Sequence, residues 1–361
     1  MNGRNRRELL RDSIALALAG LGPAGFGGCR EASPGQPARG DANGGEREGN
    51  GGGPAFQPAC LALHRRGELK RRGEQLWQSM KHCRLCPREC GAARLDGQAG
   101  FCGATTRLDV ASHYPHRGEE RPLSGSRGSG TVFLTHCGLR CVFCINWEIS
   151  HGGQGTPCRV PDLAAMMLDL ERRGCHNLNL VTPTHYAPHI LLALDEAAGK
   201  GLRLPVVYNT CGWERLDVLK LLDGVVDVYL PDFKYADARR AERYSAGAGS
   251  YPEVTRAALR EMHRQVGTAR PGPDGLIRRG LMIRHLVMPG GAEDSIRVVD
   301  WVADHLPADT YLNLMSQFTP VFKAAEYPEI DRRITRAEYH AVVRHAKDRG
   351  LTRLEIQGYP R

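Results

Sequence analysis

From Thr131 to the C-terminal end, the chain alternates between short apolar runs rich in β-branched residues and longer amphipathic segments. This alternation predicts a parallel sheet with crossover helices. The predicted strands are 130–136, 178–182, 205–209, 226–230, 281–287, 310–314 and 352–357. The predicted helices are 161–174, 187–199, 213–222, 252–266, 293–305 and 335–349. We therefore expect an α/β fold, an incomplete (β/α) barrel with its active site at the C-terminal ends of the strands.

Length and composition indicate a globular protein. The 361 residues are 41% hydrophobic, enough for one large α/β domain and a small satellite, and no apolar run is long enough to span a membrane. The net charge of +9 is not gathered into a basic stripe interleaved with aromatics, so no nucleic-acid partner is expected. Seven of the twelve cysteines fall into two close-spaced groups, which favours cofactor ligation over a disulfide framework.

The first of these groups, Cys137, Cys141 and Cys144, has CxxxCxxC spacing and follows a predicted strand. Three thiolates can hold three irons of a 4Fe–4S cluster and leave the fourth iron open. An open coordination position is where a substrate or cofactor binds a metal. The alternative is a zinc site completed by a distant cysteine such as Cys158 or Cys175. Because structural zinc sites prefer paired CxxC spacings, the cluster is favoured.

The second group lies upstream and consists of Cys83, Cys86, Cys90 and Cys102. A CxxC pair, a third thiol four residues on and a fourth after a glycine-rich turn can converge on one ion or cluster. The stretch from about Ala59 to Gly103 is short and poor in large apolar side chains, so a metal would stabilise it. An auxiliary iron–sulfur cluster and a structural zinc knuckle are both consistent with the spacing. A disulfide fits the CxxC geometry less well.

The triad spacing, with Phe143 directly before the last cysteine, resembles that of radical S-adenosylmethionine (SAM) enzymes. The resemblance implies a 4Fe–4S cluster whose open iron chelates SAM, and an electron from the reduced cluster that splits SAM into methionine and a 5′-deoxyadenosyl radical. It also implies that 126–361 is the catalytic domain, a partial barrel of the radical SAM type, that 59–125 is a metal-binding segment, and that flavodoxin or ferredoxin is the reductant.

Further motifs are similar to the radical SAM proteins related to pyruvate formate-lyase-activating enzyme. They are Cys144–Glu148, Asn179–Tyr186, Val207–Gly212, Tyr229–Tyr235, Arg284–Gly290 and Asn313–Phe318. The likeness runs from Cys83 to Gly358 and includes the upstream quartet. It implies hydrogen abstraction that places a glycyl radical on a partner protein. The alternatives are modification of a peptide or small molecule and, in another class, a non-catalytic iron–sulfur electron-transfer or metal-binding protein.

The same resemblance assigns cofactor contacts to polar residues at strand ends and in the triad loop. They are Asn146, Asn209, Asp232, Lys234, His285 and Gln317. Asp232 and Lys234 lie on one face of an extended segment, beside SAM in activases; a salt bridge at the barrel rim is the alternative. Asn209 is expected to bond SAM or its ribose, or else to cap the next helix.

Two assignments depend on which way a strand faces. Arg284 and His285 point to opposite sides, so at most one reaches the interior. The resemblance favours His285, with a hydrogen-bonded core histidine as the alternative. Gln317 is expected to contact adenine or substrate, or else to make a packing hydrogen bond.

The chain departs from the activases at one place. They carry a Gly-Gly-Glu stretch after the second strand, which holds the SAM amino group, whereas this chain has Val181–His185 there. The backbone of Thr182 or the hydroxyl of Thr184 is the expected substitute. His185 is an additional acid–base or metal-ligand candidate, or else a helix cap.

Residues 1–29 resemble a twin-arginine export signal with a lipid anchor. Arg6-Arg7 precedes an apolar stretch from Ile14 to Leu21 and an imperfect lipobox that ends at Cys29. The alternative is an arginine-rich helix of a cytoplasmic protein, since SAM and low-potential reductants are supplied in the cytoplasm. Any membrane association is expected only through this anchor. Residues 30–58, rich in Gly, Pro, Ala and charge, predict a disordered tether.

Overall fold

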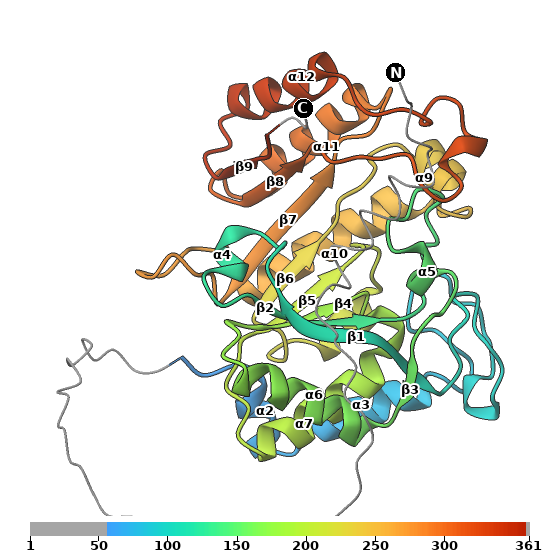
Figure 1. Ribbon diagram of the computed structural model, residues 1–361, viewed down its shortest axis with the longest axis vertical. Helices are drawn as coiled ribbons and strands as arrows, with labels where there is room; N and C mark the ends of the chain where they lie inside the picture. Colours follow the sequence, from blue (N-terminus) through green and yellow to red (C-terminus); the bar gives the residue numbers. More distant parts are fainter. Residues whose placement is uncertain (1–55, 359–361) are drawn as a thin grey trace, which may run out of the picture. The chain divides into compact units, whose positions relative to one another are not determined.

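One nine-stranded sheet organises residues 56–358, the part of the chain that this computed structural model describes (Figure 1). The strand order is β3-β1-β2-β4-β5-β6-β7-β8-β9. From β2 through β4 to β9 the strands run parallel, whereas β1 is antiparallel to both β2 and β3. The strands are β1 Leu108–His116, β2 Ser129–Leu134, β3 Thr156–Cys158, β4 Leu178–Val181, β5 Val206–Thr210, β6 Val228–Pro231, β7 Gly280–Leu286, β8 Tyr311–Met315 and β9 Leu354–Ile356.

Helices connect the successive parallel strands along the outside of the sheet (Figure 1). They are α6 Val160–Arg172, α7 Ala187–Gly199, α8 Leu216–Leu221, α10 Tyr251–Val266, α11 Ala292–His305 and α12 Arg336–Asp348. Each predicted strand and helix of this region overlaps one of these elements. The fold is therefore the expected partial (β/α) barrel, a parallel sheet that does not close on itself.

The central strands are buried from end to end because helices cover their outer face. All residues of β5 and β6 are buried, and their apolar members pack into the core of the sheet. Continuous Val-, Leu- and Tyr-rich runs are typical of parallel strands covered in this way.

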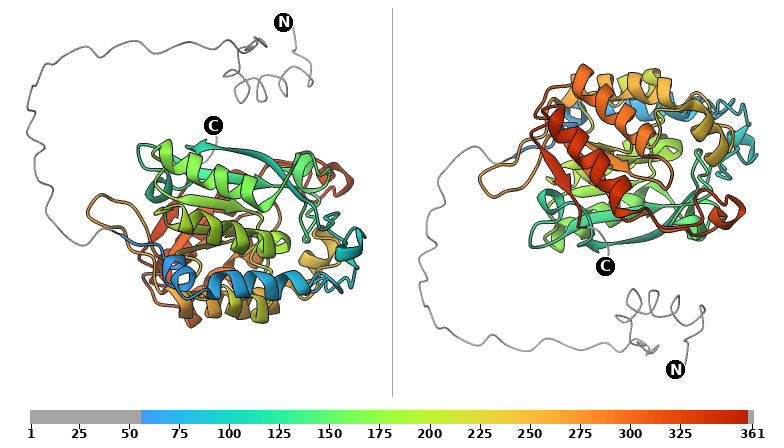
Figure 2. Two further views of the ribbon diagram at one scale, coloured as in Figure 1. Left: turned by 90° about the horizontal axis from the view of Figure 1, so that it is seen from below. Right: turned by 90° about the horizontal axis from the view of Figure 1, so that it is seen from above.

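Shorter elements fill the remaining connections. They are α2 Cys60–Arg65, α3 Glu68–Gln78, α4 Arg121–Ser124, α5 Trp147–Ser150, α9 Ala238–Tyr244 and the 3-10 helices at Arg94–Asp96, Thr184–Tyr186 and Ala324–Glu326. Helix α3 packs against α7 (Figure 2). Gly73 permits this close approach, because a Cβ there would lie 3.0 Å from the side chain of Leu192.

The cysteine-rich stretch 59–125 shares the sheet with the residues that follow it. Strand β1 pairs with β2 in antiparallel register, from Val110 opposite Leu134 to His116 opposite Ser129. At the other end, the backbone N–H of Ala59 donates to Asp227 at 2.9 Å, just before β6. The two stretches are thus joined by strand pairing and by a buried carboxylate.

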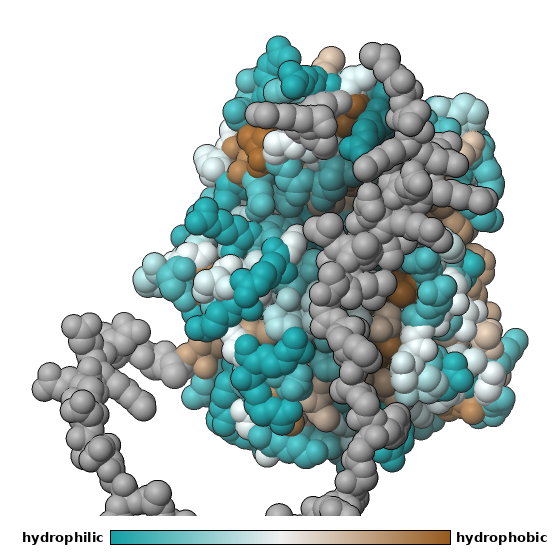
Figure 3. Space-filling view, viewed as in Figure 1, coloured by the Kyte–Doolittle hydropathy of each residue, from teal (hydrophilic) through white to brown (hydrophobic). Residues whose placement is uncertain are grey.

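The surface and the chain ends add three observations. On the coloured part of the face in Figure 3, hydrophilic residues dominate and hydrophobic ones form small separate patches. Among residues 56–358, no helix combines the length and the apolar character needed to cross a bilayer. The predicted export signal and all but the last three residues of the predicted tether lie outside the described residues.

Candidate active site

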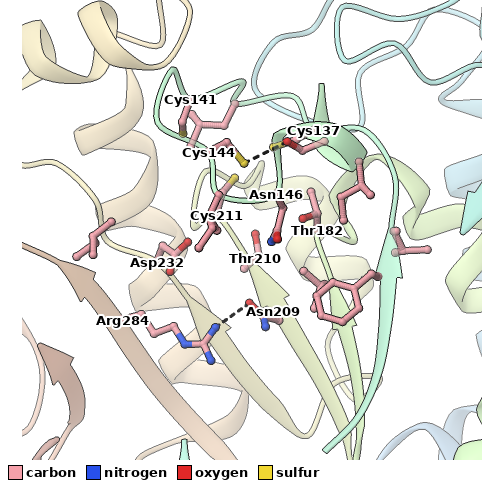
Figure 4. Close-up of a pocket in the computed structure, with 18 of the residues that line it drawn as sticks. Cys137, Cys141, Cys144, Asn146, Thr182, Asn209, Thr210, Cys211, Asp232 and Arg284 are labelled. Atoms are coloured by element: carbon pink, nitrogen blue, oxygen red, sulfur yellow. Dashed lines mark hydrogen bonds between the residues drawn. The ribbon is translucent and has the colours of Figure 1, made fainter. Parts of the chain in front are cut away.

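A cavity of about 1010 Å³ opens at the C-terminal ends of the parallel strands (Figure 4). The cysteine triad and residues from the ends of β4 to β8 line it together. Its polar and sulfur-bearing walls include Cys137, Cys141, Cys144, Asn146, Thr182, Asn209, Thr210, Cys211, Asp232, Lys234, Arg284 and Gln317. All the predicted cofactor-contacting residues except His285 are therefore found in one place.

The triad loop is held in an unusual backbone conformation. His136 and Arg140, each directly before a triad cysteine, have φ angles of 66° and 52°, in the left-handed region that few non-glycine residues adopt. Such strain is typical of functional sites. The His136 ring is wedged between Gly103 and Gly153, where a Cβ would lie 2.8 Å and 2.6 Å from it. Packing against two glycines thus fixes the start of the loop.

Arg88 ties the cysteine-rich segment to the triad loop. Its guanidinium donates to the carbonyl of Gly138 at 2.9 Å and to that of Ser245 at 2.8 Å. It also lies over the rings of Phe101 and Trp213. One side chain therefore fixes the loop between the first two triad cysteines against its surroundings.

Buried hydroxyls lie within hydrogen-bond distance of two of the triad sulfurs. Ser245 donates to Cys141 at 3.3 Å, and Ser150 lies 3.1 Å from the sulfur of Cys144. Burial raises the pKa of Cys141 to about 12 and also raises that of Cys144. Hydrogen bonds to sulfur are what tune the thiolate ligands of iron–sulfur clusters. Three thiols on one cavity wall with such donors therefore fit a cluster.

The cysteine groups are not arranged around a single ion. Within residues 56–358, no group of three or more His, Cys, Asp and Glu side chains is placed to hold one metal ion. A four-iron cluster spreads its ligands over several irons, so its cysteines need not converge on one point.

A fourth cysteine, Cys211, reaches the triad from the end of β5. Figure 4 shows its sulfur directed toward the triad, and it lines the same cavity as the triad cysteines. Its interaction with Cys137 lowers the pKa of Cys137 to about 6 and raises that of Cys211. The sequence-based candidates for a fourth thiol, Cys158 and Cys175, do not line the cavity. In the sequence, Cys211 belongs to the Val207–Gly212 motif, and no role was predicted for it.

Asp232 and Lys234 form an ion pair at the end of β6. The ammonium of Lys234 lies 2.6 Å from the carboxylate of Asp232, and the two side chains are only 16% and 21% exposed. Burial alone would lower the pKa of Lys234, but Asp232 and Cys141 raise it above its ordinary value. The salt bridge given as the alternative is therefore present, and both residues also line the cavity together with the triad cysteines.

An Arg–Glu cluster lies beside this pair. The guanidinium of Arg284 donates to Glu120 at 2.6 Å, to Glu119 and, at 3.3 Å, to the side-chain oxygen of Asn209 (Figure 4). Asn313 donates to Glu120 at 2.8 Å. Asn209 is therefore a cavity residue already bonded to a cation, rather than a helix cap.

The structure corrects the assignment of His285. Its Nδ1 lies 2.6 Å from the carbonyl oxygen of Phe233 and its Nε2 lies 2.8 Å from the hydroxyl of Ser295. The side chain is 1% exposed and does not line the cavity. Because neighbouring residues of a strand face opposite sides, Arg284 is the one that projects into the site.

Of the two residues expected to substitute for a Gly-Gly-Glu stretch, Thr182 is the one that lines the cavity. This residue has a φ of 57°, a conformation that glycine adopts more readily. The expectation that the Thr184 hydroxyl contacts SAM is corrected, because this hydroxyl is buried and donates to Glu214 at 2.5 Å. His185 is also buried, with Nε2 2.8 Å from the carbonyl oxygen of Thr135, and lies outside the cavity.

The upstream quartet lies next to the triad loop. The sulfurs of Cys90 and Cys102 are both 3.5 Å from the position a Cβ would take at Gly100. The sulfur of Cys86 is 3.2 Å from the corresponding position at Gly138. Cys90 and Cys102 thus meet at the glycine-rich turn, and Cys86 lies against the triad loop; the metal site predicted from the spacing stays a prediction.

The fold and site define an α/β protein with a partial (β/α) barrel and a cysteine-lined cavity at its strand ends. No family model matches the chain. It is 31% identical over 280 residues to the uncharacterized protein MJ0674 of Methanocaldococcus jannaschii, covering 75% of this chain and 76% of that protein. The chain belongs to the same family as this archaeal protein.

Two solved structures are also similar. SuiB of Streptococcus suis, bound to the precursor peptide SuiA, has a TM-score of 0.43 and 13% identity, covering 62% of this chain and 46% of that one. The anSMEcpe structure with bound AdoMet and Cp18Cys peptide has a TM-score of 0.39 and 12% identity, covering 59% and 56%. This chain therefore matches only about half the length of either structure.

Proposed function

We propose that this protein is a radical SAM enzyme. The observation that carries the proposal is the meeting of the CxxxCxxC cysteines with the strand-end residues Asn209, Asp232 and Lys234 along one cavity. Bound at the triad, a reduced 4Fe–4S cluster together with SAM supplies a 5′-deoxyadenosyl radical that abstracts hydrogen. The hard chemistry belongs to the cofactors, and the protein provides binding and orientation.

The side chains of the cavity have distinct tasks in this proposal. Lys234 offers a buried cation for the SAM carboxylate, and Asp232 keeps that cation in place. The backbone of Thr182, which lines the cavity, would hold the SAM amino group, the task of the Gly-Gly-Glu stretch in activases. Asn209 offers its amide to the ribose. The volume of about 1010 Å³ is at the upper end of that of small-molecule pockets, which leaves room for part of a substrate beside SAM.

We further propose that the hydrogen donor is a glycine of a partner protein, with a peptide or small molecule as the alternative. Two residues at the mouth of the cavity favour a polypeptide as the hydrogen donor. Ile145, 76% exposed, lines the cavity, and the neighbouring Trp147 is 38% exposed. Exposed apolar residues at the rim of a cavity favour contact with another chain. A reductant such as flavodoxin or ferredoxin would supply the electron.

Cys211 favours one competing function. A triad with a fourth thiol in the same cavity offers the ligand set of a fully coordinated cluster, which suits an electron-transfer protein. In that case SAM would not bind iron, and the Asp232–Lys234 pair would serve only to close the rim.

Metal analysis and spectroscopy separate the two functions. The reconstituted wild-type protein is compared with a Cys137/Cys141/Cys144→Ala triple variant and with a variant lacking the quartet cysteines. We expect the triple variant to lose about four irons per chain and SAM to change the EPR spectrum of the reduced wild-type protein. An iron–sulfur signal that depends on the triad but is unchanged by SAM would favour electron transfer.

A further inference from the structure

Cys211 occupies a place that the radical SAM proposal leaves without a role. It is the residue directly after β5, and its sulfur points into the group of triad sulfurs (Figure 4). Among the described residues, it is the cysteine outside the triad that lines the cavity; Cys60, Cys158 and Cys175 do not. Cys211 lines the same cavity as Cys137, Cys141 and Cys144. The fourth sulfur of this site is thus present in the fold.

The backbone around Cys211 is held firmly. The Tyr251 hydroxyl lies 2.8 Å from the carbonyl oxygens of both Cys211 and Asp232 and accepts from the N–H of Lys234 at 2.9 Å. The next residue, Gly212, has a φ of 80°, and a Cβ there would lie 2.0 Å from the carbonyl oxygen of Asp232. The ends of β5 and β6 therefore meet so closely that only glycine fits beside Cys211.

A cation also lies in this cavity. Lys234, ion-paired with Asp232 at 2.6 Å, lines the same cavity as Cys211 and Cys141, so its ammonium provides a counter-cation for a metal-bound thiolate. Cysteine thiolates are the usual ligands of iron–sulfur clusters. An iron left without a protein ligand is bound less firmly than the other three.

We propose that Cys211 is a fourth, exchangeable ligand of the triad cluster, bound to the open iron in the absence of SAM and displaced by SAM. This rests on the proposed function. In the exchange, the Fe–S bond to Cys211 breaks and the SAM amine and carboxylate bind that iron. The departing thiolate takes up the proton that the SAM ammonium loses, and no electron moves. Cys211 therefore protects the cluster from loss of iron while SAM is absent, and it weakens SAM binding because SAM must displace it.

Oxidation in the absence of SAM tests the proposal without relying on activity. Reconstituted wild-type protein, Cys211→Ala, Cys211→Ser and the control Cys175→Ala are treated with ferricyanide, then analysed for iron and by EPR. Cys175 is a buried cysteine outside the cavity, so its removal controls for loss of a thiol. We expect Cys211→Ala to lose about one iron per cluster and to show a 3Fe–4S signal. Wild type and Cys175→Ala should stay intact, and Cys211→Ser should be intermediate.

SAM titration of the same samples gives the second readout. Removing a ligand that must be displaced should strengthen SAM binding by about tenfold or more. The proposal for Cys211 is overturned if wild type and Cys211→Ala, both starting with the full cluster, convert equally to the three-iron form and bind SAM equally. That result would leave the radical SAM function standing. If Cys141→Ala holds as much iron and binds as much SAM as wild type, the radical SAM function itself fails.

Discussion

Arg284 of β7 and Glu120, which directly precedes α4, form a buried ion pair across the candidate active site, with Nε 2.6 Å from the carboxylate. The side chains are 14% and 2% exposed, and 164 residues separate them in the chain. Burial would raise the pKa of Glu120, but Arg284 holds it below its ordinary value. The pair thus joins the cysteine-rich stretch 59–125 to the barrel at the cavity.

Breaking this pair should destabilise the fold. Arg284→Gln leaves the carboxylates of Glu119 and Glu120 buried without their cation, so the free energy of unfolding in urea should fall by about 3–5 kcal/mol. The control is Arg278→Gln, whose pair with Asp274 is 36% and 45% exposed. That substitution should cost less than about 1 kcal/mol. Equal effects of the two substitutions would contradict the structural role of the buried pair.

Glu214 should make stability depend on pH. Burial raises its pKa from 4.5 to about 7, although the hydroxyls of Thr184 and Thr210 oppose the shift. The folded state therefore keeps a proton that the unfolded state loses above about pH 4.5, so stability should fall as pH rises to about 7. Glu214→Gln should unfold like wild type at pH 4.5 and be more stable at pH 8, by at most about 3 kcal/mol. A constant difference across this range would exclude the account.

Arg88 should control how firmly the triad loop holds its cluster. Arg88→Gln removes the bonds to the carbonyls of Gly138 and Ser245 without touching a cysteine. Iron should then be lost to a chelator several-fold faster than from wild type. Arg84→Gln changes an exposed arginine of the same segment and should match wild type. Equal iron loss from both variants would mean that Arg88 does not stabilise the loop.

Lys234 should contribute to SAM affinity rather than to cluster content. Lys234→Gln removes the buried cation, so the Kd for SAM should rise about tenfold or more while iron per chain stays unchanged. Because this leaves Asp232 without its partner, the double variant Asp232→Asn/Lys234→Gln separates loss of the cation from the cost of an unpaired carboxylate. Lys220→Gln, at an exposed site on α8, is the control. Unchanged affinity in both site variants would remove the pair from the cofactor site.

The barrel could be predicted because its strands and helices carry local signals. Buried parallel strands have continuous apolar runs, as in Val206–Thr210, and the helices between them have regular periodicity. Strand β1 was not predicted, since Leu108–His116 mixes polar and apolar residues and its pairing with β2 is a tertiary contact. Helix α9, with three arginines in Ala238–Tyr244, lacks an apolar stripe of useful length.

The site was predictable to the extent that strand ends meet at one edge of a parallel sheet. That rule placed Asn209, Asp232 and Lys234 in one cavity. It could not decide between Arg284 and His285, because a shift of one residue reverses the faces of a strand. Nor could spacing identify Cys211, which reaches the triad only through the order of β2, β4 and β5 in the sheet.

SAM cleavage tests the central claim most directly. Anaerobically reconstituted wild-type protein, Cys141→Ala and the control Cys175→Ala are reduced with dithionite and given SAM, and 5′-deoxyadenosine is measured by chromatography. The account predicts that wild type and Cys175→Ala form the nucleoside and that Cys141→Ala does not. Absence of nucleoside from wild-type protein with a fully loaded triad would contradict it, and the electron-transfer function would take its place.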